Sequence, residues 1–389
     1  MYSGMLSFSA IDRIVYGQPA AKALLAEAER LKAKRVFMLV SGTMNRTTDE
    51  ITKVRAALGA RFAGLYDRMP SHTPRDSVLE ASKLAREAGA DLIVTFGGGS
   101  VTDAGKLMQI CLRHNVTKYE DLDAYHVDVK TDGTRRVPEF DGPIVRQIAI
   151  PTTLSGGEFQ PGGGCTDNRN KVKRSYRHPL LIPRVTILDP APTVHTPMWV
   201  WLSTGVRAVD HATEALCCGA TNPASDASFI QALQLLSKSL SRVKQHPDDL
   251  DARLDCQMGV WLAMQGRQAA VSMGASHAIG HVLGGSCDVP HGQTSCVMLA
   301  PVLRYNRSVN AERQKIVAEA MGHPGEDAAD VIAAFVKSLG QPGRLSEVGV
   351  TREQFAMIAE HAMHDTWLHT NPRKITSVEQ VYEILEMAA

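Results

Sequence analysis

The sequence has no excess of charge of either sign, no long apolar run and no secretion signal. Its 42 Lys and Arg balance 41 Asp and Glu, a net charge of 42 − 41 = +1, so nothing attracts it to nucleic acid or a membrane surface. No apolar run reaches the length of a membrane span. The N-terminus has no basic segment followed by an apolar one, so we expect no signal peptide.

Cysteine is scarce and scattered. The chain has seven, an odd number, and only Cys217 and Cys218 are adjacent; no C-x-x-C pair occurs. This usage indicates a reduced, cytoplasmic protein whose thiols are buried. The rest of the composition, 44% hydrophobic and 21% charged, is typical of globular proteins, and 389 residues predict two or three domains.

Strands alternate with helices in the first half of the chain. We expect strands at 5–17 (as a pair), 35–40, 62–66, 91–96, 148–150 and 185–189. Helices are expected at 20–34, 48–58, 74–88 and 101–112. This alternation predicts a parallel, doubly wound sheet, which binds ligands beyond the carboxyl ends of its strands. A boundary at Asp189–Pro190 gives an α/β domain over 1–189, with 115–145 as a polar surface excursion.

Three glycines and a serine, Gly97, Gly98, Gly99 and Ser100, directly follow a predicted buried strand and open a helix. Glycines let the backbone approach a phosphate closely, and a helix N-terminus supplies free N–H groups and partial positive charge. The simpler interpretation is a tight turn that needs positive φ. The run matches neither the G-x-G-x-x-G fingerprint nor a Walker loop. Its place at a strand-to-helix junction nevertheless favours phosphate binding.

Two other loops qualify as nucleotide contacts. Pro151 to Glu158 carries hydroxyls and glycines after a strand, and it is either a second contact with the nucleotide or simply a turn. After the first buried strand, enzymes that select NAD commonly place an acidic residue. Here that position reads Ser41–Gly42–Thr43, and Arg46 is close by in sequence. We therefore expect NADPH to be accepted, and NADH remains open.

Strand signals fade after residue 196, which predicts an all-helical domain over 190–389. Helices are expected at 204–219, 224–244, 249–270, 271–284, 309–322, 326–339, 351–364 and 377–388. Within this domain His277, His281 and His291 lie within fifteen residues. His277 and His281 share one helix face, and we expect two glycines to end that helix before a loop returns His291.

Such a cluster can hold a metal, relay protons or bind an anion. It is not a zinc-protease site, because the Glu of H-E-x-x-H is missing. In another helix Arg207, His211 and Glu214 fall on one face at i, i+4 and i+7. Alone, that helix would carry an ion pair or a buried histidine; facing His277 and His281, it would become part of a site.

Five segments occur in the order seen in the iron-containing (group III) alcohol dehydrogenases, which the chain resembles over nearly its whole length: FGGGSVTDAGK, IPTTLSGGE, GVRAVDHATEAL, HAIGHVLGG…PHG and NPRKITS. The resemblance implies the dehydroquinate synthase-like fold, in which a Rossmann-like nucleotide domain precedes an all-α domain, with the site in the cleft. It also implies a homodimer. By the same resemblance the residues that hold NAD(P)H are Ser41, Gly42, Gly97, Gly98, Gly99, Ser100, Asp103, Thr152, Thr153, Ser155 and Lys173.

The metal-dependent members of that family hold iron or zinc with one Asp and three His. Here His211, His277 and His291 match the histidines, but the Asp position, four residues before the first His, is Arg207. A guanidinium cannot ligate a metal. Asp210 points about 100° away from His211 on the helix and is a poor substitute. We therefore do not expect a complete iron or zinc site; any metal would use these three histidines.

The GVRAxDHA segment and His72–Thr73–Pro74 are similar to the maleylacetate reductases, a branch understood to work without metal. This resemblance implies reduction of maleylacetate to 3-oxoadipate in the degradation of aromatic compounds. Arg207 would polarise the substrate oxygen or clamp a carboxylate. The histidines His211, His277 and His291 would form polar or cationic walls. His281, nearest the nicotinamide in the family, would donate or relay the proton.

Other functions stay open. The residues after His291 look more like those of alcohol dehydrogenases, and the 115–145 excursion is longer than is typical of the reductases. The alternative is a metal-dependent alcohol or hydroxyacid dehydrogenase, since three His suffice for catalytic zinc in other folds. A lyase or cyclase of the dehydroquinate synthase type is disfavoured by the incomplete metal set. A non-catalytic binding protein would not need both a nucleotide loop and a histidine cluster.

Overall fold

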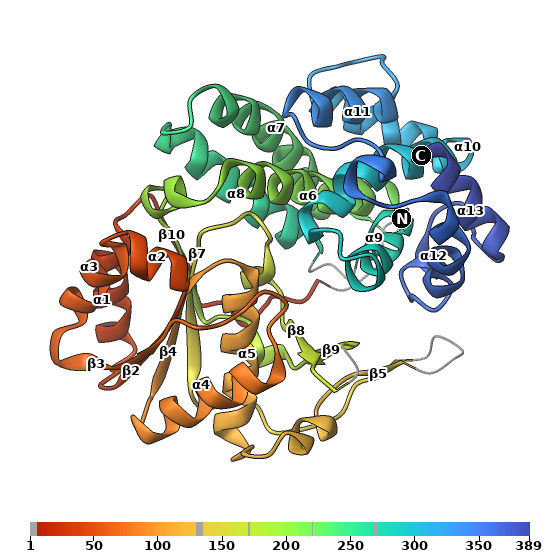
Figure 1. Ribbon diagram of the computed structural model, residues 1–389. Coiled ribbons are helices and arrows are strands. Elements are labelled where there is room, and N and C mark those ends of the chain that lie inside the picture. The colour runs from red at the N-terminus through yellow and green to blue at the C-terminus, as the bar shows by residue number, and fades with distance from the viewer. Residues whose placement is uncertain (1–5, 130–134, 170–171, 220, 268–270) are drawn as a thin grey trace. The chain divides into compact units, whose positions relative to one another are not determined.

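The computed structural model describes residues 6–129, 135–169, 172–219, 221–267 and 271–389. The chain divides into two compact units (Figure 1). The α/β unit comprises Ser9–Val129 and Arg135–Thr196, and the helical unit comprises Pro197–Ala389 together with residues 6–8. The predicted fold class, a parallel α/β region followed by a helical region, is confirmed.

A six-stranded parallel sheet lies at the centre of the α/β unit (Figure 1), in the order β1-β10-β7-β4-β2-β3. The strands are β1 (Arg13–Tyr16), β2 (Val36–Val40), β3 (Phe62–Tyr66), β4 (Leu92–Gly97), β7 (Arg146–Pro151) and β10 (Val185–Leu188). The chain passes from β2 out to β3, returns past β2 to β4, and continues to β7 and β10. Neighbouring strands β2 and β4 therefore mark the reversal of strand order, where such sheets bind ligands.

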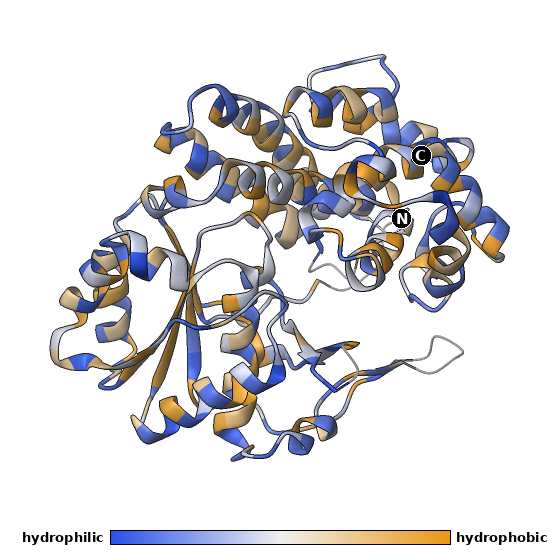
Figure 2. Ribbon diagram, in the orientation of Figure 1, coloured by the Kyte–Doolittle hydropathy of each residue, from blue (hydrophilic) through white to orange (hydrophobic). Residues whose placement is uncertain are grey.

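Helices cover both faces of the sheet: α1 (Ala20–Arg30), α2 (Gly42–Thr47), α3 (Glu50–Leu58), α4 (Arg75–Glu87) and α5 (Gly99–Arg113). Side chains alternate along β2, so that Val36, Met38 and Val40 join one core with α1 and α3. Phe37 and Leu39 join the opposite core with α4 and α5. Figure 2 shows the resulting apolar strands between helices whose outer faces are polar. Burial on both faces explains why β2 reads as a continuous apolar run.

Three local expectations were wrong. The strand pair expected within 5–17 is, in its described part, the single strand β1, which joins the sheet edge beside β10. Ser41–Gly42–Thr43–Met44, which the sequence predicts to be a turn, instead begins α2, and the Ser41 hydroxyl accepts a hydrogen bond from the Met44 N–H at 3.4 Å. The polar segment around Lys173 forms an antiparallel hairpin of β8 (Gly162–Asp167) and β9 (Val172–Arg177). The sequence hides β8 because glycine has little strand preference.

The 115–145 excursion lies partly outside the described residues. Its described part contains a 3₁₀ turn, Glu120–Ala124, and the short antiparallel pair β5 (Asp128–Val129) and β6 (Arg135–Arg136). Arg75 anchors this region from α4, since its guanidinium donates to the Tyr119 carbonyl at 3.0 Å and to Asp123 at 2.7 Å. The excursion is thus tied to the sheet unit through a buried arginine.

The helical unit is built around α6 (Met198–Cys217), in which every residue from Trp201 to Cys217 is buried. The surrounding helices are α7 (Pro223–Gln245), α8 (Leu250–Arg267), α9 (Ala275–Ser286), α10 (His291–Ala320), α11 (Ala328–Ser338), α12 (Phe355–Ala362) and α13 (Val378–Met387). Helices α7, α8 and α10 all contact α6 (Figure 1). Any charged group on α6 must therefore find its partners inside the protein.

Helix α10 begins well before the residues predicted from the sequence. The expected segment 309–322 is only its final part; the helix starts at His291 and changes direction at Asn310, whose φ is −138°. Pro301 lies inside it. Near its start, Gly292 packs against α6 so closely that a Cβ would lie 2.9 Å from the Thr204 backbone nitrogen. A glycine is needed there to bring the end of the histidine segment onto α6.

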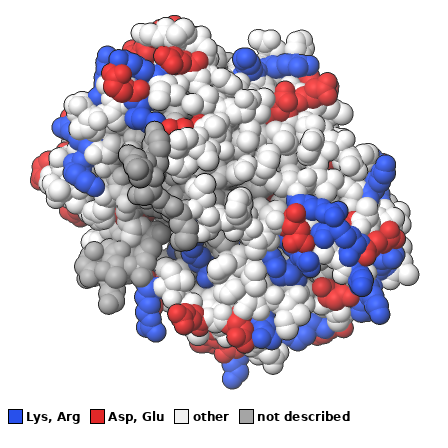
Figure 3. Space-filling model, turned by 180° about the vertical axis from the view of Figure 1, so that it is seen from behind, with Lys and Arg blue, Asp and Glu red and all other residues white. Residues whose placement is uncertain are grey.

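The surface and the helices of the described residues fit the composition of the sequence. None of those helices is long and apolar enough to cross a lipid bilayer. On the face drawn in Figure 3, acidic and basic side chains are interspersed around a broad uncharged area. The seven cysteines all lie within the described residues and are free thiols.

Candidate active site

The ends of three adjacent strands converge on the glycine run in the α/β unit. The Ser41 N–H donates to the Phe96 carbonyl at 2.8 Å, and the Thr152 N–H donates to the Gly97 carbonyl at 3.0 Å. A Cβ on Gly98 would lie 3.1 Å from the Thr153 methyl carbon, and one on Gly99 would lie 3.6 Å from Ser155. The structure therefore brings together the residues predicted to hold a pyrophosphate, beside the first turn of α5. Free N–H groups there can bind an anion.

His72 and Thr73 are held in a strained conformation beside this loop. Both are non-glycine residues with positive φ, 65° and 53°. The His72 N–H donates to the Ser100 hydroxyl at 3.1 Å, and the Thr73 hydroxyl donates to the Ser100 carbonyl at 3.1 Å. Thr166 on β8 donates its hydroxyl to the His72 carbonyl at 2.7 Å. Strain of this kind tends to occur at functional sites, where surrounding bonds maintain it.

Asp103 and Lys173 meet at the β8–β9 hairpin. The Asp103 carboxylate accepts the Gly164 N–H at 2.9 Å, and the Lys173 side chain lies against Gly164. Lys106, which the sequence analysis did not single out, is fully buried and donates to the Gly157 and Gly162 carbonyls at 2.6 Å each. Burial lowers the pKa of Lys106, while Asp103 and Glu158 oppose that shift. This lysine fastens the second loop and the hairpin to α5.

Opposite charges flank the start of α2. A Cβ on Gly42 would lie 2.8 Å from the Arg46 Nη1 and would collide with the Asp67 carbonyl. The Asp67 carboxylate accepts a hydrogen bond from the Asn45 side chain at 2.8 Å. No pattern in the sequence pointed to Asp67, because this residue follows β3 rather than β2. Its position shows that the loop after β2 has an acidic neighbour from the adjacent strand.

In the helical unit, Glu214 of α6 holds the N-terminus of α9. Its carboxylate accepts the backbone N–H groups of Gly274 and Ser276 at 3.1 and 2.8 Å. It also pairs with the His277 Nδ1, at 2.7 Å. A carboxylate is favoured at a helix N-terminus by the helix dipole and by the free N–H groups. Burial nevertheless raises the pKa of Glu214 to about 8, with a further contribution from Asp210.

Asp210 also faces the histidines, although its position on α6 suggested otherwise. Its carboxylate accepts the Ser276 hydroxyl at 2.8 Å and lies 3.4 Å from the His277 Nδ1. Helix α9 approaches the side of α6 that carries Asp210, which the 100° offset from His211 could not reveal. Burial raises the pKa of Asp210 to about 6, while Ser295 and Arg207 act in the opposite direction.

The imidazole rings of His211 and His277 stack with their centroids 4.7 Å apart. The Nδ1 of His211 and the Nε2 of His277 are buried and have no hydrogen-bond partner within the described part of the chain. Burial is the largest cause that holds the pKa of each imidazole well below its usual value, and Arg207 adds to the shift. Both shifts favour the neutral form of the imidazole, and thus the polar rather than the cationic of the two kinds of wall that were expected.

Arg207 is buried beside these rings but is only loosely held. Its Nη1 lies 3.5 Å from the His291 carbonyl, 3.4 Å from the Thr294 hydroxyl and 3.3 Å from the Ser295 hydroxyl. Burial lowers the pKa of Arg207 to about 10, and Asp210 and Glu214 resist that shift. The guanidinium remains charged at pH 7, in a place where long hydrogen bonds compensate that charge weakly.

His281 and His291 form the more open part of the cluster. Their rings are parallel, with centroids 6.2 Å apart. The His281 Nδ1 pairs with the Asp365 carboxylate at 2.7 Å, and 36% of the His281 side chain is exposed. Trp367 packs against His281 at 4.9 Å and against His277 at 5.7 Å, measured between ring centroids. Asp365 and Trp367 lie in the loop after α12, and no pattern in the sequence pointed to them.

Arg267, the last residue of α8, completes the cluster. Its guanidinium carbon lies 5.7 Å from the Trp367 ring centroid. The predicted residues of this unit, Arg207 and the four histidines, thus come together. Five further residues belong to the cluster, although no local sequence pattern predicted that they would: Asp210, Arg267, Ser276, Asp365 and Trp367.

The metal-dependent enzymes that the chain resembles hold iron or zinc, and the donor atoms present here do not suit such an ion. Within the described residues Asp210, Glu214 and His277 offer ligand atoms within 4.8 Å of one another. The oxygens of Glu214 already accept the N–H groups of α9 and the His277 imidazole. The guanidinium of Arg207 adds a buried positive charge beside the set. A divalent cation would have to displace the helix cap and sit beside that charge, so it does not fit the set.

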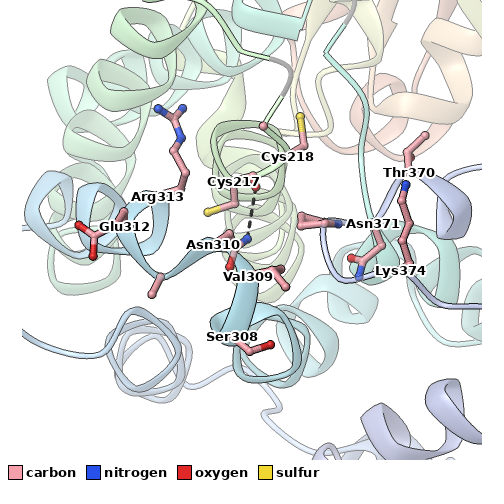
Figure 4. Close-up of a pocket in the computed structure, with 13 residues that line it drawn as sticks. Cys217, Cys218, Ser308, Val309, Asn310, Glu312, Arg313, Thr370, Asn371 and Lys374 are labelled. Atoms are coloured by element: carbon pink, nitrogen blue, oxygen red, sulfur yellow. Dashed lines mark hydrogen bonds between the residues drawn. The ribbon is translucent and has the colours of Figure 1, made fainter.

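A cavity of about 590 Å³ lies elsewhere in the helical unit (Figure 4). It is bounded by Cys217 and Cys218 at the end of α6, by the kink of α10 near Asn310, and by the loop that carries Asn371 and Lys374. The Asn310 side chain donates to the Cys217 carbonyl at 3.2 Å across it. None of the clustered histidines lines this cavity, so it is separate from the candidate active site.

Comparisons with known proteins agree with this architecture. Residues 12–190 match the family described as iron-containing alcohol dehydrogenase, and residues 201–389 match the C-terminal region of the Fe-containing alcohol dehydrogenase family. Dehydrogenase FUM7 of Gibberella moniliformis is 34% identical, over 97% of this chain and 96% of that protein. The maleylacetate reductase of a Rhizobium species is 30% identical, over 95% of this chain and 94% of that protein.

A solved structure shows the same fold. The maleylacetate reductase from Agrobacterium tumefaciens superposes with a TM-score of 0.83 at 28% sequence identity, covering 100% of this chain and 98% of that one. The chain therefore belongs to the iron-containing alcohol dehydrogenase family. Within that family it lies on the branch that includes the maleylacetate reductases, and it is an oxidoreductase.

Proposed function

We propose that the protein is an NAD(P)H-dependent reductase of maleylacetate or a closely similar unsaturated oxo-dicarboxylate, and that it works without a metal ion. The observation that carries this proposal is the buried, loosely held guanidinium of Arg207 beside two neutral histidines. A metal cation would be repelled there, whereas an anionic substrate would be attracted. The likeness to maleylacetate reductases over nearly the whole chain supports the same substrate class.

The reaction would transfer a hydride from the nicotinamide to the carbon–carbon double bond conjugated with the ketone of maleylacetate. A proton would then add to the neighbouring carbon and give 3-oxoadipate and NAD(P)⁺. Negative charge develops on the ketone oxygen during hydride transfer, and a fixed positive group stabilises it. Arg207 would do this, or would bind the adjacent carboxylate; its weak internal contacts, which leave it able to form stronger ones, support this role.

His281 is the proposed proton donor. Its Nδ1 is bonded to Asp365, so the imidazole is fixed in one orientation and Nε2 is the nitrogen that can serve the substrate. Partial exposure allows the ring to exchange its proton with water. His211 and His277, which are neutral, would instead contribute hydrogen bonds and a nonpolar stacked surface.

The α/β unit would hold the cofactor. The N–H groups at the start of α5 and the hydroxyls of Thr153 and Ser155, which lie 3.0 Å apart, can bind the pyrophosphate. Arg46 beside Gly42 supports acceptance of the 2′-phosphate of NADPH, whereas Asp67 opposes it. We expect NADPH and NADH both to be used; a ratio of kcat/KM that favours NADH strongly would contradict the role given to Arg46.

The deciding experiment is oxidation of NADH and NADPH by the purified protein with maleylacetate, before and after dialysis against a strong chelator. Turnover that survives metal removal supports the proposal. Loss of turnover on chelation, with recovery on adding zinc or iron, would instead support a metal-dependent dehydrogenase. No turnover under either condition would remove maleylacetate as the substrate and direct the assay to alcohols and hydroxyacids.

A further inference from the structure

The strained pair His72–Thr73 beside the glycine run is most unusual at its second residue. Histidine enters the left-handed backbone region more readily than most residues, so the positive φ of His72 is a modest departure. Thr73 is β-branched, and its φ of 53° crowds its side chain against the main chain. Only 2% of Thr73 is exposed. Thr73 therefore keeps a buried conformation that costs free energy and that glycine would adopt without strain.

Hydrogen bonds from two sides keep the pair in this conformation. On one side the Thr73 hydroxyl donates to the Ser100 carbonyl, and the His72 N–H donates to the Ser100 hydroxyl, at 3.1 Å each. On the other side Thr166 of β8 donates its hydroxyl to the His72 carbonyl at 2.7 Å and its N–H to the Thr73 carbonyl at 3.0 Å. The pair is thus clamped between the first turn of α5 and the β8–β9 hairpin.

These contacts determine what the Ser100 hydroxyl can do. A hydroxyl has one proton to donate and two lone pairs that accept. The His72 N–H occupies one lone pair, and no group among the described residues accepts the Ser100 proton. That proton is therefore available to a ligand at the first turn of α5. A serine hydroxyl without such a contact would be free to turn towards a carbonyl of its own segment instead.

We propose that Thr73 is a positioning residue for the cofactor: it keeps the His72 N–H on the Ser100 hydroxyl, so that this hydroxyl donates its proton to the pyrophosphate of NAD(P)H. The inference rests on the proposed function, which assigns NAD(P)H to this loop. A hydroxyl that already has its donating orientation loses little freedom on binding, and its hydrogen bond to a charged oxygen is a strong one. The strain at Thr73 then serves binding rather than folding.

Thr73→Val is the direct test, because valine keeps the branched shape and removes only the hydroxyl. Calorimetry without substrate should show the dissociation constant of NADPH rising by about 10-fold. Thr73→Ser, which keeps the hydroxyl, should restore most of the affinity. The matched control is Ser82→Ala on α4, since Ser82 is another buried residue whose hydroxyl donates to a main-chain carbonyl, that of Val78 at 2.7 Å. This control should bind NADPH as the wild type does.

A double-mutant cycle with Ser100→Ala separates positioning from general support of the fold. Ser100→Ala removes the donating hydroxyl and should itself raise the dissociation constant by about 10-fold or more. If Thr73 acts through Ser100, Thr73→Val should add almost nothing in the Ser100→Ala background. Multiplied effects of the two substitutions would overturn the proposal, and so would wild-type affinity in Thr73→Val.

Circular dichroism and thermal melting establish that each variant is folded. If Thr73→Val does not fold, Thr166→Val provides the test, because it loosens the same pair from the hairpin side. Thr166→Val should raise the dissociation constant of NADPH when Ser100 is present and have almost no further effect on Ser100→Ala. An unchanged dissociation constant in Thr166→Val would then overturn the proposal.

Binding of ADP-ribose, which has the pyrophosphate but no nicotinamide, separates this inference from the proposed reaction. Thr73→Val should weaken ADP-ribose and NADPH by the same factor; a loss confined to NADPH would overturn the proposal. If the wild type and Thr73→Val bind both ligands as expected but maleylacetate is not reduced, the proposed reaction fails and the role of Thr73 stands. If maleylacetate is reduced and Thr73→Val binds NADPH normally, the role of Thr73 fails and the reaction stands. A wild type that binds neither ligand would overturn both.

Discussion

Each of the two units buries a cation, and the two are held very differently. Lys106 in the α/β unit donates to two carbonyls at 2.6 Å each and lies 3.4 Å from Asp103. Arg207 in the helical unit has contacts of 3.3 to 3.5 Å only. Short bonds to the main chain satisfy the lysine within the fold. The arginine keeps unused bonding capacity, which is what a ligand-binding group requires.

We interpret this difference as one between a charge that stabilises the fold and a charge that is available to a ligand. A buried charge that is fully hydrogen-bonded fixes loops, as Lys106 does for the second loop and the hairpin. A buried charge with weak partners is an electrostatic cost to the folded protein, and bound substrate can offset that cost. The comparison leads to predictions in which stability and activity change separately.

The largest effect should follow from replacing the two cations in turn. Arg207→Gln should lower kcat/KM for the dicarboxylate by about 100- to 1,000-fold, because a charged partner of the substrate is lost. Lys106→Met should instead reduce the free energy of unfolding by about 3 kcal/mol, because it leaves buried acceptors without a donor. Steady-state kinetics and denaturant unfolding of both variants measure the contrast. If the two substitutions changed stability and activity equally, the different roles given to Lys106 and Arg207 would be contradicted.

Asp365→Asn tests whether the helical site depends on a partner from a distant loop. The amide removes the negative charge that fixes the His281 Nδ1 proton, so kcat should fall by about 100-fold while KM changes little. A variant with unchanged kcat would show that Asp365 only packs against the loop.

Gly98→Val tests the main-chain character of the cofactor site. A Cβ there already lies 3.1 Å from the Thr153 methyl carbon, and the added methyl groups occupy space beside the first turn of α5. We expect KM for NAD(P)H to rise by about 10-fold with a small change in kcat. Gly99→Ala is the matched control, because its Cβ meets Ser155 at an ordinary 3.6 Å. If both substitutions raise KM equally, contact with Thr153 is not the cause.

The prediction with the smallest expected effect on activity concerns pH and stability. The pKa of Glu214 in the folded protein, about 8, lies above its unfolded value, so this group stabilises the fold fully at low pH and loses that contribution as pH rises towards 8. The unfolding free energy of the wild type, relative to Glu214→Gln, should decrease from pH 5 to 8 by at most about 1.4 kcal/mol per unit. Glu360→Gln, an exposed substitution on α12, is the control variant.

The α/β unit could be read from the sequence in most of its parts. The residues proposed to hold the cofactor lie at strand ends, and parallel strands necessarily bring their carboxyl ends to one edge of a sheet. Gly97 to Ser100 are consecutive, and main-chain N–H groups need no partner from elsewhere. The hairpin of β8 and β9 could not be predicted, because Gly162 to Gly164 have little strand preference. Asp67 could not be predicted either, because it follows a neighbouring strand.

In the helical unit the sequence determined the ingredients: the spacing of His277, His281 and His291, and the replacement of a family aspartate by Arg207. The tertiary structure decided their chemistry. It packed α9 against the side of α6 that carries Asp210, and it brought Asp365 to His281 across 84 positions. It also placed the Arg267 guanidinium over the Trp367 ring. Local patterns fix which face of a helix a side chain occupies, whereas charge, proton position and substrate fit depend on which distant helix packs against that face.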